Sequence, residues 1–291
     1  MLDEKYHDFR ASLWLIWKQI GLPNPTPVQY EAANYLQYGG PKVFLSMFRG
    51  AGKSYITSAY VVWSHAMSDH WGTPGGCSCA ACGPMIAVNG NIRPRDLRFR
   101  VVSAASDKVR EFCSFAKRII VEVPEFQHLR PADNEAAWAQ DRFDIAGAPI
   151  AQVASVTATG IFGQLTGGRA NEIIWDDVET PNTSETVGQR QKLRQRMTEF
   201  SALMIPEYTR MIGLGTPQCE ESIVDEMAEK GYSVKFWPSE YPTEPEKLSW
   251  GDRLADSIRK APADMSGRSV EPGRFSELIL AEKKVEMGLS S

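Results

Sequence analysis

The sequence predicts an α/β fold with a mostly parallel central sheet, and three observations support this prediction. Apolar runs of strand length alternate with longer segments of helical periodicity, as in strands joined by crossover helices. One apolar strand, at 43–47, leads through a glycine-bearing turn into Gly-Lys-Ser and a helix. Another, at 172–177, ends in two aspartates. With 291 residues, the chain is long enough for one large domain or for a domain with an appendage.

The individual elements are assigned from the spacing of apolar residues and from the glycines and prolines between them. Helices are expected at 1–20, 28–38, 54–68, 106–122, 184–204, 220–230 and 276–287. Strands are expected at 43–47, 98–103, 142–146, 150–156, 172–177, 210–213 and 232–237. The third and fourth strands are expected to pair around the turn at 147–149, and the glycine-rich stretch 159–169 is too flexible for a helix. Residues 71–96, rich in Gly, Pro, Cys and Asn, are expected to form an inserted surface loop.

Composition narrows the class of protein. A hydrophobic content of 43% supports a packed core and argues against wholesale disorder. The formal net charge of -4 and the pI near 5.7 exclude a globally basic DNA-coating protein. The basic run at 190–196 is either a local basic surface or a solvated helix face. Because no run of 18 apolar residues occurs, no membrane span is expected.

The N-terminus and the cysteines indicate the compartment. The first residues are polar and lack the apolar core of a secretory signal. Five cysteines are an odd number in a chain without an export signal. We therefore expect reduced thiols, a cytoplasmic protein and no secretion.

The loop at 48–54 has the layout of a phosphate-binding loop. Its backbone N–H groups would point at phosphate oxygens, and the loop is completed by Arg49, Gly50, Ala51, Gly52, Lys53 and Ser54. Lys53 would reach the β- and γ-phosphates of a nucleotide, and the Ser54 hydroxyl would ligate Mg²⁺. Two features depart from the usual pattern, since Met47 stands where the first glycine would fall and Arg49 lies inside the turn.

Arg49 has two interpretations. Its planar guanidinium suits γ-phosphate oxygens, and an arginine acting in cis stabilises charge in the transition state. The alternative is a solvent-facing loop arginine.

The acids after the strand at 172–177 are the candidate metal and water-orienting groups. Hydrolysis of a phosphoanhydride needs a carboxylate beside Mg²⁺ and a group that orients the attacking water. Asp176 is expected on the metal side, and Asp177 is the first choice for water activation. Glu179 is the second choice, because it points the same way as Asp177 if the strand continues. The alternative is a strand end capped by exposed acids.

Three further residues are candidates. Thr216, at the end of the strand beginning at 210, could sense the γ-phosphate; it could also be a simple exit from the strand. Gln29 opens a helix, and its amide offers the donor and acceptor that suit an adenine edge, although a surface role is the alternative. Arg169, in the glycine-rich stretch, could bind phosphate or a neighbouring subunit, or pair with a nearby carboxylate.

Taken together, these motifs resemble the large terminase subunit of tailed bacteriophages, most closely the short-tailed type. The resembling segments keep the family's order and approximate spacing; they are 48–54, 102–106, 163–170, 176–179 and 214–218. The resemblance implies a P-loop NTPase of the ASCE type that hydrolyses ATP with Mg²⁺ to drive double-stranded DNA into a preformed capsid. It also implies the portal protein and the small terminase subunit as partners, a homo-oligomeric ring when active, and action in the host cytoplasm. In isolation such a domain can be monomeric.

The resemblance covers about 25 to 240. It implies an ATPase motor core at 1–240 and, at 241–291, a linker and small helical lid subdomain leading to a nuclease domain that this chain lacks. No DNA cleavage is expected. Two other classes stay open: a helicase-like or remodelling ATPase, and a non-enzymatic docking module with a decayed nucleotide site.

The inserted loop carries three thiols within six residues, Cys77, Cys79 and Cys82, with His65 and His70 upstream. Such a set could hold Zn²⁺. The alternative is a flexible loop with unligated cysteines.

Overall fold

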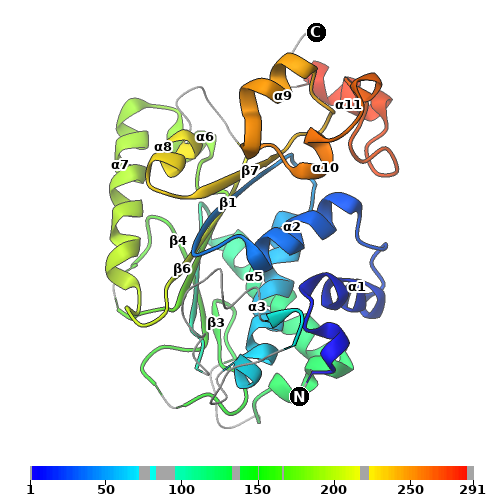
Figure 1. Cartoon of the computed structure of the whole chain (residues 1–291). Helices are drawn as coiled ribbons and strands as arrows, with labels where there is room; N and C mark the ends of the chain where they lie inside the picture. Colours follow the sequence, from blue (N-terminus) through cyan, green and yellow to red (C-terminus); the bar gives the residue numbers. More distant parts are fainter. Residues whose placement is uncertain are drawn as a thin grey trace.

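One seven-stranded sheet forms the centre of the molecule (Figure 1). The computed structural model describes residues 2–71, 79–82, 96–132, 138–149, 151–165, 167–216 and 223–286. The strand order is β3-β4-β2-β5-β6-β1-β7. The strands are β1 Lys42–Met47, β2 Phe99–Ser103, β3 Arg142–Phe143, β4 Val156–Gly160, β5 Glu172–Asp176, β6 Arg210–Gly215 and β7 Ser233–Trp237. The six strands from β4 to β7 in this order pair in parallel, and β3 runs antiparallel to β4.

Helices cover both faces of the sheet (Figure 1). One face carries α1 Phe9–Ile20, α2 Pro27–Tyr38, α3 Lys53–Trp71 and α5 Ser106–Glu122. The other carries α6 Pro181–Ser184, α7 Val187–Thr198 and α8 Ile223–Glu229. After β7 come α9 Glu244–Trp250, α10 Asp256–Arg259 and α11 Glu277–Glu286. Short 3₁₀ helices complete the chain at Glu4–Tyr6, Pro124–Leu129, Glu199–Leu203, Gly251–Arg253 and Ala263–Met265.

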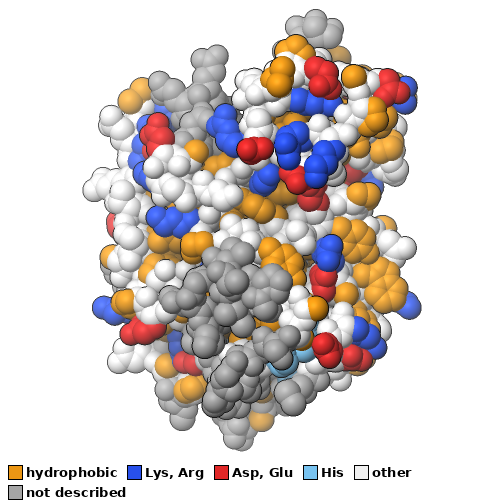
Figure 2. Space-filling view, in the orientation of Figure 1, with side chains coloured by type: hydrophobic (Ala, Val, Ile, Leu, Met, Phe, Trp, Pro, Cys, Tyr) orange, Lys and Arg blue, Asp and Glu red, His pale blue; other side chains and the backbone are white. Residues whose placement is uncertain are grey.

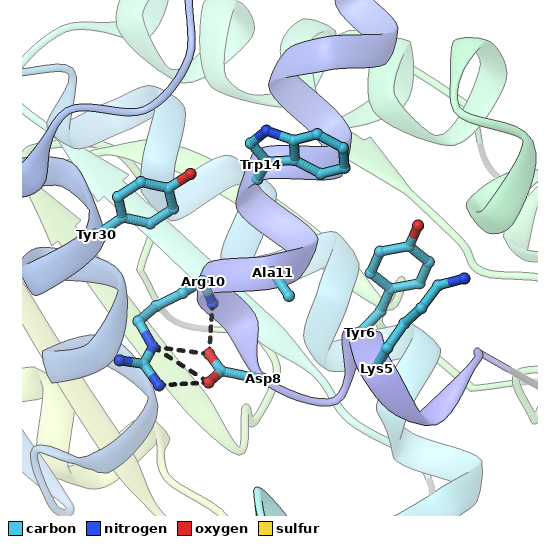
Figure 3. A pocket seen from close by; sticks show the side chains of 7 residues that line it. All are labelled: Lys5, Tyr6, Asp8, Arg10, Ala11, Trp14 and Tyr30. Atoms are coloured by element: carbon cyan, nitrogen blue, oxygen red, sulfur yellow. Dashed lines mark hydrogen bonds and ion pairs between the residues drawn. The ribbon is translucent and has the colours of Figure 1, made fainter.

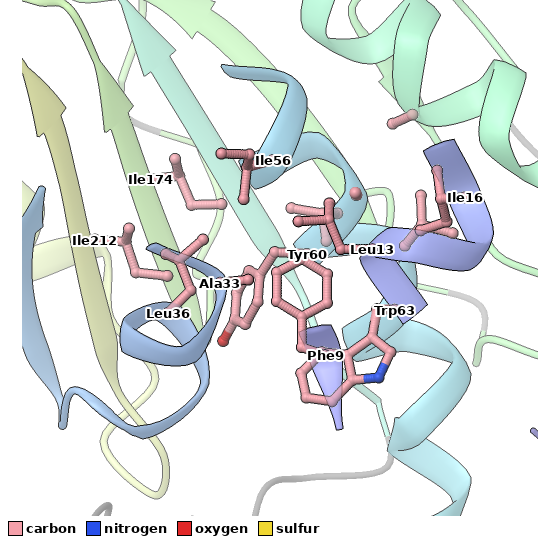
Figure 4. Close-up of a cluster of buried hydrophobic side chains, with 14 of the residues drawn as sticks. Phe9, Leu13, Ile16, Ala33, Leu36, Ile56, Tyr60, Trp63, Ile174 and Ile212 are labelled. Carbon is pink, nitrogen blue, oxygen red and sulfur yellow. The ribbon is translucent and has the colours of Figure 1, made fainter. Parts of the chain in front are cut away.

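Alternation along the strands builds a separate core on each face. In β5, Ile174 joins the core under α1–α3 and α5, whereas Ile173 and Trp175 join the core under α7 and α8. Figure 4 shows the first core, where Phe9, Leu13 and Ile16 of α1 face Tyr60 and Trp63 of α3, next to side chains of α2 and the sheet. These helices therefore cover the sheet by burying their apolar faces, as their sequence periodicity predicts.

Local signals set the start of α2, which matters because α2 touches the 48–54 loop. Thr26 and Gln29 form a reciprocal capping box, and Pro27 occupies the first helical position. The helix therefore begins at a defined residue, and Gln29 lies in its first turn.

Most predicted elements are confirmed, but one prediction is wrong and one helix has different bounds. The strand pair expected at 142–146 and 150–156 is instead β3 with β4, and β4 lies at Val156–Gly160 because it completes the sheet beside β2. The helix expected at 184–204 is found with shorter bounds, as α7 at Val187–Thr198 followed directly by a 3₁₀ helix at Glu199–Leu203. The capping box of Thr186 and Gln189 sets its start.

The surface carries mixed charge. Figure 2 shows Lys and Arg side chains gathered near acidic ones over the C-terminal helices, where Lys235, Arg259 and Lys260 pair with Asp256. The basic run of α7 has partners in the chain too, since Arg194 pairs with Glu226 and Arg196 with Glu199. These contacts favour a solvated helix face for that run.

No helix among the described residues is long and apolar enough to cross a membrane. An open hollow beside α1 is lined by Lys5, Tyr6, Asp8, Arg10, Ala11, Trp14 and Tyr30 (Figure 3). Asp8 and Arg10, two of its lining residues, pair with each other.

Candidate active site

The 48–54 loop connects β1 to α3 at the carboxyl edge of the parallel strands. Gly50 and Gly52 have φ values of +85° and +91°, a region that favours glycine. A Cβ atom on Gly52 would lie 2.9 Å from Nε2 of Gln29, so the loop approaches α2 closely. The turn is closed by the N–H of Ala51, which donates to the carbonyl of Phe48 at 3.3 Å. The loop therefore depends on its glycines, because Gly50 and Gly52 adopt positive φ values that other residues rarely adopt.

Lys53 is held at the start of α3 by groups from two strands. Its side chain is only 7% exposed, and Nζ donates to the Met47 carbonyl at 3.1 Å and to Oγ1 of Thr216 at 2.9 Å. The Thr216 hydroxyl in turn donates to the same Met47 carbonyl at 2.8 Å. Nζ also lies 3.8 Å from Oδ1 of Asp177. Thr216 is thus a direct neighbour of the loop lysine.

Ser54 and Asp176 bring the loop helix and β5 together, because the Ser54 hydroxyl donates to Oδ2 of Asp176. Asp176 is 7% exposed, and its other oxygen, Oδ1, is buried without a hydrogen-bond partner among the described residues. Burial and the charge of Asp177 raise the pKa of Asp176 to about 6, against the opposing effects of Ser54 and Lys53. A buried carboxylate oxygen that lacks a partner is a ready ligand for a cation.

Asp177 and Glu179 occupy different surroundings. The strand does not continue past Asp176, so the two side chains do not share a strand face as the sequence had suggested. Asp177 has a φ of +43°, uncommon for a residue other than glycine, and its side chain is 50% exposed next to Lys53. Glu179 is buried, and its Oε1 accepts the N–H of Ile223 at 3.2 Å. Of Asp177 and Glu179, Asp177 is therefore the acid that faces the loop.

Gln29 lies against the loop. Its Nε2 donates to the Ala51 carbonyl at 2.9 Å, and its Oε1 accepts the N–H of Thr26 at 3.1 Å. The side chain is 5% exposed. Both ends of the amide thus bind backbone, which fixes the spacing between α2 and the loop.

Sequence reasoning missed three residues at this site, all from the C-terminal part of the chain. Arg274 Nη2 donates to the Gly50 carbonyl at 2.8 Å, and Arg274 Nη1 lies 3.2 Å from Oε2 of Glu271. The Phe275 ring stands 2.6 Å from the position of a Cβ atom on Gly50 and packs edge-on against Phe48 at 5.5 Å. Glu271 also accepts the Thr26 hydroxyl. No local signal identifies these residues, because they are far from the loop in the chain; Arg274 is 224 positions from Gly50.

The two candidate arginines lie apart. Arg49 is exposed in the loop. Arg169 is exposed just before β5, and its neighbour Ala170 bridges Met204 at the amino edge of the sheet. Seven residues of extended chain, roughly 20 Å, separate Arg169 from Asp176. The described structure therefore brings Arg49, but not Arg169, to the loop of the same chain.

The predicted thiol set is only partly described, because Cys77 lies outside the described residues. Cys79 and Cys82 lie together with His70 and also with His7, which the sequence did not suggest. His65 is not in this group; its ring packs against Phe99 at 5.2 Å.

A glycine-bearing loop follows the buried strand β1 and leads into a helix, in a mostly parallel sheet where β6 separates β1 from β5 and its terminal acid. This arrangement defines a P-loop NTPase fold. No family model matches the chain. The large terminase subunit of enterobacteria phage T3 is 37% identical over 289 residues, which are 97% of this chain and 45% of that protein. The chain is related to phage large terminase subunits, and it spans about half the length of this relative.

The fold agrees with this relationship. The crystal structure of the bacteriophage HK97 large terminase superimposes with a TM-score of 0.50 and 14% identity, over 96% of this chain and 54% of that one.

Proposed function

We propose that this chain is the ATP-hydrolysing motor domain of a viral DNA-packaging terminase, which drives double-stranded DNA into a preformed capsid. One observation carries the proposal: hydrogen bonds join Lys53 to Thr216 and Ser54 to Asp176 at the carboxyl edge of the sheet. An α/β sheet binds its ligands at this edge. The 37% identity to the large terminase subunit of phage T3 supports a role in DNA packaging.

The residues fit a nucleotide with Mg²⁺. The loop amides from Arg49 to Ser54 would bind phosphate oxygens, and Lys53 would leave Met47 and Thr216 to neutralise the β- and γ-phosphates. Ser54 and the unpartnered Oδ1 of Asp176 are the oxygen ligands that Mg²⁺ prefers. When bound, Mg²⁺ would neutralise charge that develops on the transferred phosphoryl group.

Asp177 is the residue we assign to orient the attacking water. It is half exposed and 3.8 Å from Lys53, whereas Glu179 is buried and accepts an N–H from the start of α8. Asp177 therefore can accept a proton or a hydrogen bond from water at the phosphate end of the loop without breaking a contact inside the protein. Arg49 is assigned to the γ-phosphate, and Arg169 to a neighbouring subunit. Gln29, whose amide binds backbone at both ends, is proposed to hold the loop on the side where the adenine would lie.

The remaining assignments follow the relationship to large terminases. We propose a motor core at 1–240 and a helical lid subdomain from 241 onwards, with double-stranded DNA, the portal protein and the small terminase subunit as partners. We also propose a homo-oligomeric ring as the active form, working in the cytoplasm of the infected bacterium. Neither nuclease activity nor a membrane partner is part of this proposal.

The test is ATP hydrolysis measured with and without double-stranded DNA and portal, on wild type and on Lys53→Ala. We expect Lys53→Ala to lose at least 100-fold in turnover, since it removes the phosphate-neutralising charge. Lys42→Ala is the matched control: Lys42 opens β1, and its Nζ contacts the Lys230 carbonyl at 3.2 Å, at the opposite edge of the sheet. Turnover retained in Lys53→Ala would refute the assignment. Strand separation in a displacement assay would instead favour a helicase-like ATPase, and binding without hydrolysis would favour a docking module.

A further inference from the structure

Four potential metal ligands meet at the N-terminal end of the molecule, away from the P-loop. They are His7, between the first 3₁₀ turn and α1; His70, in the last turn of α3; and Cys79 and Cys82 of the described segment 79–82. One ligand atom from each lies within 4.8 Å of every other. His70 is 17 positions beyond Lys53 on the same helix, so the two sites are about 25 Å apart.

The spacing of these atoms is close to that of a tetrahedral zinc site. Nδ1 of His7 lies 3.4 Å from Sγ of Cys79. Zinc–nitrogen and zinc–sulfur bonds at the tetrahedral angle put a nitrogen and a sulfur ligand about 3.5 Å apart. The His7 and His70 rings lie with their centroids 4.2 Å apart at 51°, so they are neither stacked nor coplanar. Small movements of the other side chains would complete the tetrahedron.

The surrounding hydrogen bonds orient the ligands. Nε2 of His7 lies 3.2 Å from the carbonyl of Leu2, so that nitrogen carries the proton and Nδ1 faces Cys79 with its lone pair. The indole N–H of Trp71 donates to Sγ of Cys82 at 3.4 Å. Metal-binding histidines almost always donate their second ring nitrogen in this way, and an N–H donor stabilises a thiolate.

The backbone carrying the ligands is held in place by α2. Nε2 of Gln37, which is fully buried, donates to the carbonyls of His7 at 3.1 Å and Ala81 at 3.5 Å. The Tyr38 hydroxyl donates to the same Ala81 carbonyl at 3.0 Å. The N–H of Cys82 closes a turn onto the carbonyl of Cys79 at 3.2 Å. The two ligand-bearing segments are therefore side by side before any metal binds.

The geometry points to a structural Zn²⁺ site made by His7, His70, Cys79 and Cys82. Two thiols would each release a proton to the solvent on binding, and the two thiolates balance the charge of Zn²⁺. A neutral site suits this position, because His7 and Cys82 are buried. Four protein ligands leave no open coordination position, so the ion would be structural and not catalytic. It would tie the N-terminus and segment 79–82 to the end of α3, which stabilises the folded state over the unfolded chain.

The experiment measures metal content of the purified full chain and the absorption of its cobalt form. We expect about one zinc per chain and, after stripping and titration with Co²⁺, a thiolate-to-cobalt charge-transfer band with tetrahedral d–d absorption. Cys82→Ser and His70→Ala should lose the metal, whereas His70→Cys, which keeps a ligand, should retain it. Cys113→Ser is the matched control, because Cys113 is a buried thiol of α5 outside the group.

The Cys77→Ser variant and the cobalt titration of wild type test the ligand set further. Cys77→Ser should retain one zinc, since four other ligands complete the site; loss of zinc there would overturn the ligand set. If Cys82→Ser fails to fold, the cobalt titration of folded, metal-stripped wild type decides alone, and absence of the charge-transfer band refutes the site. Unchanged zinc content in both Cys82→Ser and His70→Ala would refute it as well.

Discussion

The Ser54 hydroxyl donates a hydrogen bond to Asp176, and this contact joins the first turn of α3 to the end of β5. The two residues are 122 positions apart in the chain. Their contact leaves the second oxygen of Asp176 buried and unpartnered, and Asp177 next to it adds a second negative charge. This arrangement of carboxylates therefore favours binding of a cation. Without a cation, the buried charge of Asp176 lowers the stability of the folded protein.

Asp176→Asn is expected to stabilise the folded protein at neutral pH in the absence of Mg²⁺. The folded-state pKa of Asp176, about 6, is above its ordinary value of 3.8, so the folded protein binds the proton more tightly than the unfolded chain. This contribution is present below pH 4 and is lost as the pH rises through 6. We expect Asn to recover roughly 1–3 kcal/mol at pH 8 and nothing near pH 4, measured by thermal unfolding.

Asp252→Asn is the control for that measurement, because Asp252 is 97% exposed. The same Asp176→Asn protein should have lost ATP hydrolysis. For wild type, the affinity for Mg²⁺ should fall as the pH is lowered through 6, because the proton competes with the cation for Asp176. A destabilised Asp176→Asn at pH 8 would contradict the account.

Asp177→Asn is expected to lower turnover by about 100-fold or more with little change in ATP binding, because it removes the carboxylate that we propose orients the attacking water. Asn tolerates the left-handed backbone at this position, so the fold should be kept. Glu179→Gln should cost less than 10-fold, since the amide oxygen can still accept the Ile223 N–H. Steady-state kinetics of both variants decide the assignment, and the reverse order of effects would make Glu179 the water-orienting group.

Thr216→Val is expected to reduce turnover about 10-fold while the protein stays folded. The change removes the hydroxyl that accepts from Lys53 and donates to the Met47 carbonyl, with little change in volume. Thr216→Ser restores the hydroxyl and should recover most of the activity. Equal kinetics of the Val and Ser variants would show that the hydroxyl has no part in hydrolysis.

Phe275→Ala is expected to raise the KM for ATP about 5- to 10-fold with a smaller effect on kcat. The ring covers Gly50 and packs on Phe48, so its loss frees the loop that we propose binds phosphate. Arg274→Ala, which removes the donor to the Gly50 carbonyl, should act in the same direction. Arg268→Ala, an exposed arginine on the same segment, is the control. An unchanged KM in both variants would mean that the C-terminal segment only covers the loop.

Arg210→Met is expected to destabilise the protein by about 3–5 kcal/mol, because Arg210 is 1% exposed and is the cation of a buried polar network. Its guanidinium donates to the carbonyls of Gly40 and Leu36 and to the hydroxyl of Tyr60, which itself donates to Glu172. Arg118→Met, on the exposed face of α5, should change stability by less than about 0.5 kcal/mol. Urea unfolding at matched pH gives both values, and similar midpoints for the two variants would contradict this role.

How far the sequence predicts this protein depends on the range of the interactions involved. The loop at 48–54, the aspartates after β5 and most helices are evident from neighbouring residues, because glycine turns, strand alternation and helix periodicity are local. The wrong prediction has a non-local cause, because strand β4 is placed by its pairing with β2. The start of α7 at Val187 was missed because the capping box of Thr186 and Gln189 sets it.

By itself, then, the sequence determined the glycine-bearing loop at 48–54, the acidic end of β5 and the relationship to large terminases. Only the tertiary structure decided that Thr216 contacts Lys53, that Phe275 covers Gly50 and that His7 joins His70 beside Cys79 and Cys82. The physical reason is that each of these contacts joins segments separated by many residues. Their proximity depends on which strands pair and which helices pack, and no short stretch of sequence contains that information.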